Sequence, residues 1–496
     1  MKPLKWALAL FLVACGPEAL PPPPPPPPPP KSDRDNTPAT ASTDALGPRP
    51  TVASPAPFAP PEPKVYTHAN GMTVWLLERH ALPVVSIDLV VGAGARHDPD
   101  GKGGLAYATA TMLDEGAGTR DALAIARDID KLGASLHTGA YADYSFVQLT
   151  SLKKNLGAAA AIMSDVVLKP TFSPVEWKRV SDLWKNDLVQ RQSEPGAVAN
   201  VVISAVVFGQ KHYYAHPTDG TTKSAAKIGL DDLKKFYEAE WRPQKATCVV
   251  VGDVSKDELD KILDASFGKW QKSTTPAAPV AAEPATPTGR RVFVVDRADA
   301  PQSYIAVARK GVAAADPEAP PLVRVNSALG GSFTSRLNQD LREEHGWSYG
   351  AKSRFSFTQK AGVFVASAAV HTEHTGDALQ AMLKHVNELT KSGLTDEEVQ
   401  KSRMLARADL VEAFEGVEAA ARRLARNAGI GLAADHEGKA SRVVDGASKD
   451  DLAKLAKKYI DPTDAAIVIV GPRAQIEPQL KKIGIADFKT TGPEGD

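Results

Sequence analysis

Alternating apolar and polar residues predict the strands of this chain, and alanine-rich apolar runs predict its helices. Val65 to Thr67 and Thr73 to Leu77 flank the dipeptide Asn70-Gly71, a strong signal for a β-hairpin. Tyr144 to Thr150 alternates with a period of two, and the following run Leu156 to Leu168 is rich in alanine. A period of two is typical of a half-buried strand, whereas a long alanine-rich run favours a helix. Together they predict a mixed fold of strands and helices.

The pattern occurs twice, which indicates an internal duplication. Leu230 to Val254 and Lys449 to Pro472 each contain an aspartate pair, a helical stretch, a proline and a valine-rich strand ending in glycine, about 219 residues apart. A second pair of segments agrees at an offset of about 218 residues. Its matching positions are Pro83 with Pro301, Ile87 with Ile305, Leu89 with Val307, Asp98 with Asp316 and Pro99 with Pro317. Chance agreement at nearly one offset is improbable, so two related domains are expected.

The expected domains are 64–271 and 290–486, each a sheet with helices packed on one face. The segment 272–289 is rich in alanine, proline and threonine, which is typical of an interdomain linker. Two helix starts fit the capping box, in which a hydroxyl and a carboxylate satisfy free backbone amides. They are Ser173 with Glu176 and Thr395 with Glu398.

The first 15 residues are predicted to be a lipoprotein signal peptide. Lys2 and Lys5 precede an apolar run ending at Ala14, which is shorter than the roughly 20 residues that cross a bilayer. Leu12 to Cys15 resembles the lipobox of bacterial lipoproteins, in which the cysteine is lipidated. A plain secretory signal with an incidental cysteine is the alternative. Gly16 after the cysteine suggests an outer-membrane protein facing the periplasm.

Residues 16–63 are predicted to form a disordered, proline-rich linker. Pro21 to Pro30 are ten consecutive prolines, and 20 of the chain's 39 prolines fall by Pro63. Such a segment cannot build a packed core and favours an extended polyproline spacer. Docking of the prolines onto a partner domain is an alternative.

The amino-acid composition disfavours nucleic-acid binding and excludes a fold held together by disulfides. The 59 lysines and arginines balance 59 aspartates and glutamates, so no overall positive field attracts nucleic acid. Hydrophobic residues make up 43% of the chain, which allows a sizeable core. The two cysteines, Cys15 and Cys248, exclude a disulfide framework, and Cys248 within an apolar strand is expected to be a buried thiol.

Two runs in the second copy resemble the second domain of the pitrilysin and insulinase family of zinc peptidases. They are Leu329-Gly-Gly-Ser-Phe-Thr-Ser-Arg-Leu337 and Leu341-Arg-Glu-Glu-His-Gly-Trp-Ser-Tyr349. The resemblance is to the bacterial and mitochondrial-processing-peptidase branch and covers nearly all of 64–486. It implies an α+β fold of tandem duplicated α/β sandwich domains, pitrilysin-like in the LuxS/metallohydrolase-like class.

The first copy departs from this family at the zinc motif. Family members carry H-x-x-E-H on a helix, so that two histidines hold the metal while the glutamate activates water. The corresponding helix, Gly104 to Glu115, has Tyr107, Ala110 and Thr111 at the three motif positions. Asp187 falls near the position of the distal ligand, but a catalytic zinc needs about three protein ligands. This domain is therefore predicted to bind no zinc and to hydrolyse no peptide by itself.

Other histidines are not expected to replace the motif. His212 and His216 lie between a glycine and a proline, which predicts a loop rather than a helix face. His371 and His374 follow a predicted strand and are interpreted as solvated turn residues. No metal is therefore assigned to this chain.

The second copy keeps the residues that the resemblance implies for substrate binding. Arg342 and Tyr349 occupy the family's arginine and tyrosine positions, with Gly346 between them for a left-handed turn. Both side chains are hydrogen-bond donors suited to a scissile carbonyl and to the oxyanion that replaces it. Gly330 and Gly331 form the glycine-rich segment that lies near the substrate in family members. A surface arginine that caps its helix and a tyrosine packed on the sheet are the structural alternative.

The sequence thus predicts a lipid-anchored, non-metal-binding subunit of a two-chain zinc metalloendopeptidase, inactive alone. Its expected partners are a subunit of the same family with an intact zinc motif, peptide substrates and, through the anchor, a membrane. Zinc is expected in the partner, and no cofactor in this chain. The alternative is an inactive homologue that binds peptides or scaffolds an envelope complex. A third hypothesis is a hydrolase with other metal ligands, which few residues support.

Overall fold

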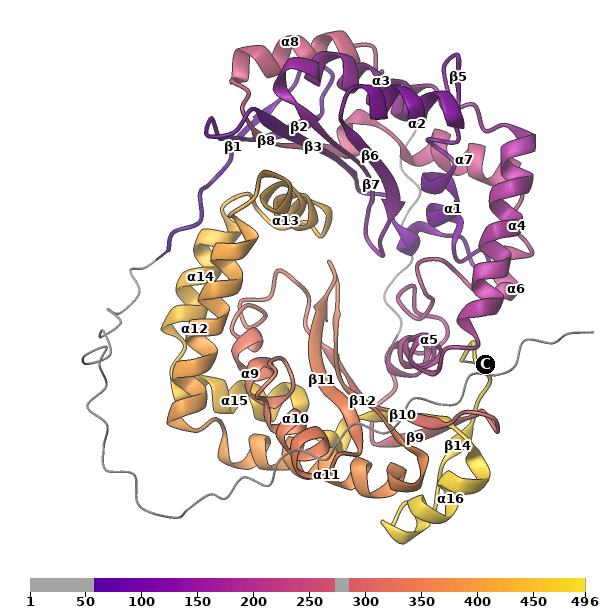
Figure 1. Cartoon of the computed structure of the whole chain (residues 1–496), viewed down its shortest axis with the longest axis vertical. Coiled ribbons are helices and arrows are strands. Elements are labelled where there is room, and N and C mark those ends of the chain that lie inside the picture. The colour runs from indigo at the N-terminus through magenta and orange to yellow at the C-terminus, as the bar shows by residue number, and fades with distance from the viewer. Residues whose placement is uncertain (1–57, 273–284, 496) are drawn as a thin grey trace, which may run out of the picture. The chain divides into compact units, whose positions relative to one another are not determined.

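The protein forms two six-stranded sheets, each accompanied by its own helices (Figure 1). The structure is a computed structural model that describes residues 58–272 and 285–495. The predicted signal peptide, Cys15 and nearly all of the proline-rich linker lie outside the described residues. No helix in the described ranges is long and apolar enough to cross a membrane.

The first half contains the elements up to Phe267. They are β1 (Lys64–Thr67), β2 (Thr73–Glu78), β3 (Val84–Val91), α1 (Leu105–Thr111), β4 (Gly116–Ala117), β5 (Arg120–Asp121), α2 (Ala122–Lys131), β6 (Ser135–Ala140), β7 (Ser145–Leu152), α3 (Leu156–Leu168), α4 (Pro174–Arg191), α5 (Pro195–Phe208), α6 (Thr222–Ala225), α7 (Leu230–Glu240), β8 (Ala246–Gly252) and α8 (Lys256–Phe267).

The second half repeats this succession from Arg291 onward. Its elements are β9 (Arg291–Asp296), β10 (Gln302–Gly311), α9 (Leu322–Leu329), α10 (Arg336–Asn338), the π-helical turn η4 (Gln339–Glu344), β11 (Ser348–Phe357), β12 (Gly362–His371), α11 (Thr375–Ser392), α12 (Asp396–Ala413), α13 (Val417–Gly429), α14 (His436–Gly446), α15 (Lys449–Ile460), β13 (Ala466–Gly471), α16 (Arg473–Lys482) and β14 (Lys489–Thr490).

The two sheets have the same order over five of their six strands and differ at one edge, where β1 is antiparallel to β2 and β14 is parallel to β9. The first runs β1-β2-β8-β3-β7-β6, and the second, read from its matching edge, runs β14-β9-β13-β10-β12-β11. In each sheet one inner pair is parallel, β2 with β8 and β9 with β13, while the next pairs toward β6 and β11 are antiparallel. The duplication inferred from sequence therefore extends to strand pairing, which confirms the tandem α+β fold.

Each half has its own apolar core between the sheet and the helices of that half. In the first half Val74, Ile87 and Leu149 project from the sheet toward α3, where Met163 is fully buried. In the second half the sheet packs on α11 and α15, whose inner faces are buried. This agrees with the expectation of helices on one face of each sheet.

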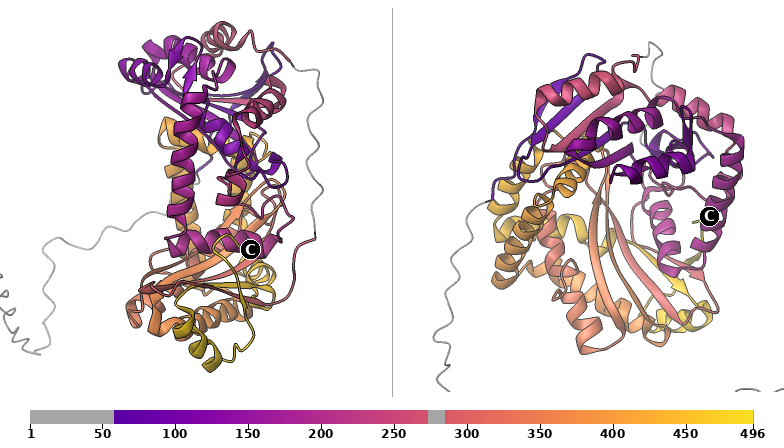
Figure 2. Two further views of the ribbon diagram at one scale, coloured as in Figure 1. Left: turned by 90° about the vertical axis from the view of Figure 1, so that its right-hand side faces the viewer. Right: turned by 45° about the horizontal axis from the view of Figure 1, so that its top comes forward.

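The opposite face of each sheet is covered by a helix from the other half. Helix α5 of the first half packs against β10 and β13 (Figure 2). Val198, Val202 and Val206 of α5 form one buried apolar cluster there with Val468 and Val470. Helix α13 of the second half packs against β3 and β8. This reciprocal cover of α5 and α13 is absent from the sequence-based expectation, because periodicity shows that a helix is buried without showing what covers it.

A buried polar network also joins the halves. Asp143 is 3% exposed, and its carboxylate accepts hydrogen bonds from the Tyr214 hydroxyl at 2.5 Å and from the Gln359 amide at 2.7 Å. The same Tyr214 oxygen accepts a hydrogen bond from the Lys360 amide at 3.3 Å. The turn between β11 and β12 is thereby fixed to the first half.

Most local predictions agree with the structure, with one exception. The predicted hairpin is β1 and β2, and the predicted helix Leu156 to Leu168 is α3. The capping box at Thr395 and Glu398 is present. The one at Ser173 is wrong, since Ser173 makes no side-chain cap and Glu176 pairs with Arg179 instead. Pro174 at the first helical position starts α4 without it.

Candidate functional site

Helix α1, which carries the degenerate zinc-motif positions, is held firmly at its N-terminus. The carboxylate of Asp98 accepts hydrogen bonds from the amides of Gly104 and Ala106, each at 2.8 Å. Gly104 has a φ of +99°, and a Cβ there would lie 2.8 Å from the ring of Trp184. Glycine is required on both counts, because a side chain would be strained and would collide with the indole.

The three motif positions carry no metal-binding imidazole or carboxylate. Tyr107 is half-buried, with its ring centroid 6.1 Å from that of Trp184. Ala110 is fully buried, and the Thr111 hydroxyl donates to the Tyr107 carbonyl at 3.0 Å. Burial raises the pKa of Tyr107, and the charges of nearby acidic groups, Asp187 among them, add to this effect. The phenol is therefore neutral at physiological pH, and the set does not fit a zinc ion.

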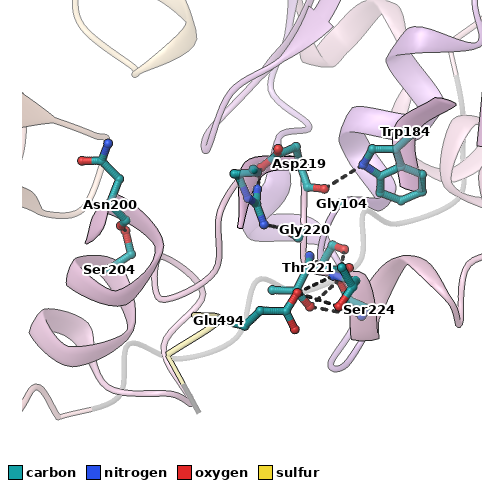
Figure 3. Close-up of polar contacts among 12 residues, drawn as sticks. Gly104, Trp184, Asn200, Ser204, Asp219, Gly220, Thr221, Ser224 and Glu494 are labelled. Atoms are coloured by element: carbon teal, nitrogen blue, oxygen red, sulfur yellow. Dashed lines mark hydrogen bonds and ion pairs between the residues drawn. The ribbon is translucent and has the colours of Figure 1, made fainter. Parts of the chain in front are cut away.

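A loop between α5 and α6 closes over the start of α1 (Figure 3). The Trp184 indole donates to the Asp219 carbonyl at 2.9 Å, and Arg191 binds the Asp219 carboxylate at 2.7 Å. The Ser224 hydroxyl donates to the Gly103 carbonyl at 2.7 Å. Indole, guanidinium and backbone thus fix one another around the degenerate motif.

The C-terminal tail reaches the same region, which sequence reasoning missed. Glu494 Oε1 accepts hydrogen bonds from the amide and the hydroxyl of Thr222, both at 2.7 Å, and from Gln192 at 3.3 Å (Figure 3). The carboxylate thereby caps the start of α6. No motif marks this contact, because a single glutamate near a chain end has no characteristic sequence pattern.

Of the four histidines considered from the sequence, His212 and His216 lie in the loop after α5, His371 is the last residue of β12 rather than part of a turn, and His374 lies in the turn that follows. His212 is fully buried in the loop after α5, and burial lowers the pKa of His216 in the same loop. His374 ends a short turn after β12, and its ring stacks on Trp347 at 5.3 Å between centroids.

In the second half, the predicted donors lie on either side of a turn. Arg342 belongs to η4, and its guanidinium lies 4.6 Å from the Phe333 ring centroid and 3.3 Å from the Glu343 carboxylate. Gly346 has a φ of +63°, the left-handed turn that the sequence predicted. Tyr349 is the second residue of β11 and is 87% exposed. The structural alternative required a tyrosine packed on the sheet, and the exposed phenol of Tyr349 does not agree with it.

The two glycines before this segment lie where a side chain would not fit. Neither Gly330 nor Gly331 has a positive φ. A Cβ on Gly330 would lie 2.5 Å from the Ser353 amide, and one on Gly331 would lie 2.4 Å from the Asn326 side chain. Close approach to β11 at Gly330 and to α9 at Gly331 therefore requires glycine at both positions. Their predicted contact with substrate remains a prediction.

Comparison with known proteins agrees with this organisation. Residues 73–216 match the family described as insulinase (peptidase family M16), and residues 227–405 match the peptidase M16 inactive domain. An uncharacterized zinc protease of Bacillus subtilis is 22% identical over 364 residues, which cover 73% of this chain and 87% of that protein. A probable mitochondrial-processing peptidase subunit beta of Arabidopsis thaliana is 22% identical over 421 residues, covering 83% of this chain and 79% of that protein.

Structural comparison leads to the same family. The crystal structure of a peptidase M16 inactive domain from Pseudomonas fluorescens superposes with a TM-score of 0.76 at 25% identity, covering 83% of this chain and 98% of that one. The first-half match includes the degenerate motif helix, and the inactive-domain match includes Arg342 and Tyr349. With two matched family models in tandem and the duplicated sheets that they imply, this chain belongs to peptidase family M16, the insulinase family.

Proposed function

We propose that this chain is the subunit of a two-chain zinc endopeptidase that contributes substrate-binding donors, while a partner of the same family contributes the catalytic zinc. The support is a contrast between the halves. The motif positions of the first half offer a phenol, a methyl group and a hydroxyl bonded to backbone. The second half presents Tyr349 almost fully to solvent. One relative is also named as a subunit of a processing peptidase.

The chemistry assigned to Arg342 and Tyr349 is stabilisation of charge on the scissile carbonyl. Guanidinium and phenol both donate hydrogen bonds to an oxygen that becomes negative during attack on the peptide bond. Glu343 is the acidic neighbour of Arg342, and both side chains are substantially exposed, so this ion pair is weak and easily exchanged for substrate. Zinc, when bound by the partner, would activate the attacking water.

The test is reconstitution with a family member that carries an intact H-x-x-E-H motif from the same genome. Each chain alone should cleave no fluorogenic peptide, and the mixture should be active. Arg342→Ala and Tyr349→Phe should each lower kcat by about 10²- to 10³-fold, as for a lost oxyanion donor, while the complex still forms. Arg354→Ala removes a partly buried guanidinium that donates to Asn200, and Tyr141→Phe removes an exposed phenol, so both should leave kcat unchanged. Full activity of both site variants would refute the assignment.

A second candidate function is an inactive homologue that scaffolds an envelope complex or binds peptides. The observation that favours it is the motif helix α1, whose positions Tyr107, Ala110 and Thr111 offer no zinc ligand set. It predicts a stable partner complex in which no combination of chains hydrolyses peptides. Activity in the reconstitution experiment separates the two functions.

We also propose that Cys15 anchors the protein in a bacterial envelope, with the folded part facing the periplasm. The support is the segment Leu12 to Cys15 after a short apolar run. Several acyl chains on one residue give stable membrane attachment, which a single chain does not. Cys15→Ser should abolish labelling by a palmitate analogue and release the protein from membranes. Unchanged labelling would refute the anchor.

A further inference from the structure

A group of potential metal ligands lies on the π-helical turn that carries Arg342. The amide of His345 donates to the carbonyl of Asp340 at 3.1 Å, five residues back, which defines the π-helical turn. The ligand atoms of Asp340, Glu344 and His345 all lie within 4.8 Å of one another. π-Helical turns are rare and are frequently found at functional sites.

The carboxylate of Asp340 is buried and only half satisfied. The residue is 8% exposed, and its Oδ2 lies 2.5 Å from Nε2 of His385. Its Oδ1 is buried, accepts no hydrogen bond and lies 3.2 Å from Nε2 of His345. A buried carboxylate oxygen without a donor is costly, and a cation would remove that cost.

The spacing of these atoms suits a shared metal ion. Two ligand atoms at about 2.1 Å from a tetrahedral zinc ion are separated by about 3.4 Å. The separation of 3.2 Å between Asp340 Oδ1 and His345 Nε2 is close to this value, although the pair makes no hydrogen bond. Two carboxylates would neutralise a dication, and imidazole with carboxylate is a ligand set that zinc accepts.

Neighbouring rings hold the ligands in place. The His345 ring stacks on Trp347 with centroids 4.0 Å apart and planes inclined by 7°, and Trp347 stacks in turn on His374. His385 fixes the orientation of Asp340, as second-layer groups do for metal-binding carboxylates. The His345 ring and the Asp340 carboxylate are therefore held in fixed orientations beside each other.

We propose that Asp340, Glu344 and His345 bind one divalent transition-metal ion of the zinc class, with His385 as the positioning residue for Asp340. This site differs from the degenerate motif of the first half and departs from the expectation that this chain holds no metal. Three protein ligands leave a position for water. Bound metal would fix the turn that carries Arg342, two residues after Asp340, so the site would regulate the geometry of that donor.

The test is equilibrium dialysis of the full chain, free of a histidine tag, against ZnCl2, followed by metal analysis. One equivalent of zinc should be retained. His345→Ala and Glu344→Gln should each weaken binding at least tenfold, and His385→Ala by about 10- to 100-fold. His345 and Glu344 are exposed, so these variants should fold, which circular dichroism can verify.

Two neighbouring variants are the controls. His371→Ala removes an exposed imidazole at the end of β12, outside both the cluster and the ring stack, and Glu343→Gln removes an adjacent exposed carboxylate outside the cluster. Both should retain the full equivalent. Less than one equivalent in the unchanged chain, or full retention by both His345→Ala and Glu344→Gln, would overturn the site. The first result would identify the contact between His345 and Asp340 as an ordinary ion pair.

Discussion

Asp88 offers the sharpest test of how α13 lies on the first sheet. It occupies the middle of β3, where Gln148 and Val249 are its cross-strand neighbours, and it is 3% exposed. Its Oδ2 accepts no hydrogen bond. Burial raises the pKa of Asp88 to about 7, and the opposite charges of Arg422 and Glu418 on α13 modify that shift. The carboxyl group is therefore protonated in the folded state at mildly acidic pH.

The magnitude follows from proton linkage. An aspartate in an unfolded chain titrates near 3.8, so between about pH 4 and pH 7 the folded state holds a proton that the unfolded state has lost. The free energy of unfolding then falls by about 1.4 kcal/mol for each unit that the pH rises in this window. From pH 5 to pH 8 the loss is about 3 kcal/mol. The asparagine of the Asp88→Asn variant cannot titrate and escapes this loss. The difference in free energy of unfolding between variant and unchanged protein should therefore shift by about 3 kcal/mol in favour of the variant from pH 5 to pH 8.

Thermal unfolding of both proteins at pH 5 and pH 8 measures the effect. Because each half covers the sheet of the other, the two belong to one compact unit, Pro57–Asp496, and for a unit of this size about 3 kcal/mol corresponds to a change of about 3 °C in the Tm difference. Comparing differences cancels any fixed cost of burying the asparagine amide. Asp130→Asn, at an exposed position on α2, should show no such change. A Tm difference for Asp88→Asn that is equal at both pH values would refute the reasoning.

Three further changes test the packing and the contacts between the halves. In a urea titration, Gly429→Ala should lower the free energy of unfolding by about 1–3 kcal/mol, because its Cβ would lie 2.3 Å from the ring of Tyr144. Gly446→Ala, which has open space around its Cβ, should leave the free energy of unfolding unchanged. Arg324→Leu should cost about 3 kcal/mol by urea unfolding, since the fully buried guanidinium donates to three backbone carbonyls that would lose their donor; a cost below 1 kcal/mol would contradict that account. Asp143→Ala should accelerate amide hydrogen exchange in residues 358–361 at least tenfold, because the Gln359 amide loses its acceptor, and unchanged exchange would show that the turn is held by other contacts.

Local patterns predicted the fold where neighbouring residues determine the structure. The alanine-rich run Leu156 to Leu168 forms α3 with the predicted bounds, and Cys248 is a buried thiol in β8. Ser173 makes no side-chain cap and Glu176 pairs with Arg179, since a capping pattern carries no information on which of the possible contacts forms. The reciprocal cover of α5 and α13 depends on contacts between residues far apart in the sequence, which periodicity does not encode.

Some features of the candidate site could likewise be predicted from the sequence, whereas others required the structure. The loss of metal ligands at Tyr107, Ala110 and Thr111 could be predicted from the resemblance to the family, because it identifies the helix on which members carry H-x-x-E-H. The packing of Trp184 against Gly104 required the structure, because the two residues come from different helices. The π-helical turn was likewise hidden, since His345, five residues after Asp340, approaches it only where the helix widens.

The exchange of α5 and α13 also bears on how such a chain originates. A polypeptide with a single copy would expose one apolar face of its sheet and one apolar helix. It would be stable only as a homodimer in which the helix of each subunit covers the sheet of the other. Duplication of the copy within one gene places both copies in the same polypeptide, so the helix that covers each sheet is always present. Each copy can then specialise, because the partner that stabilises it is always present at the other end of the same polypeptide.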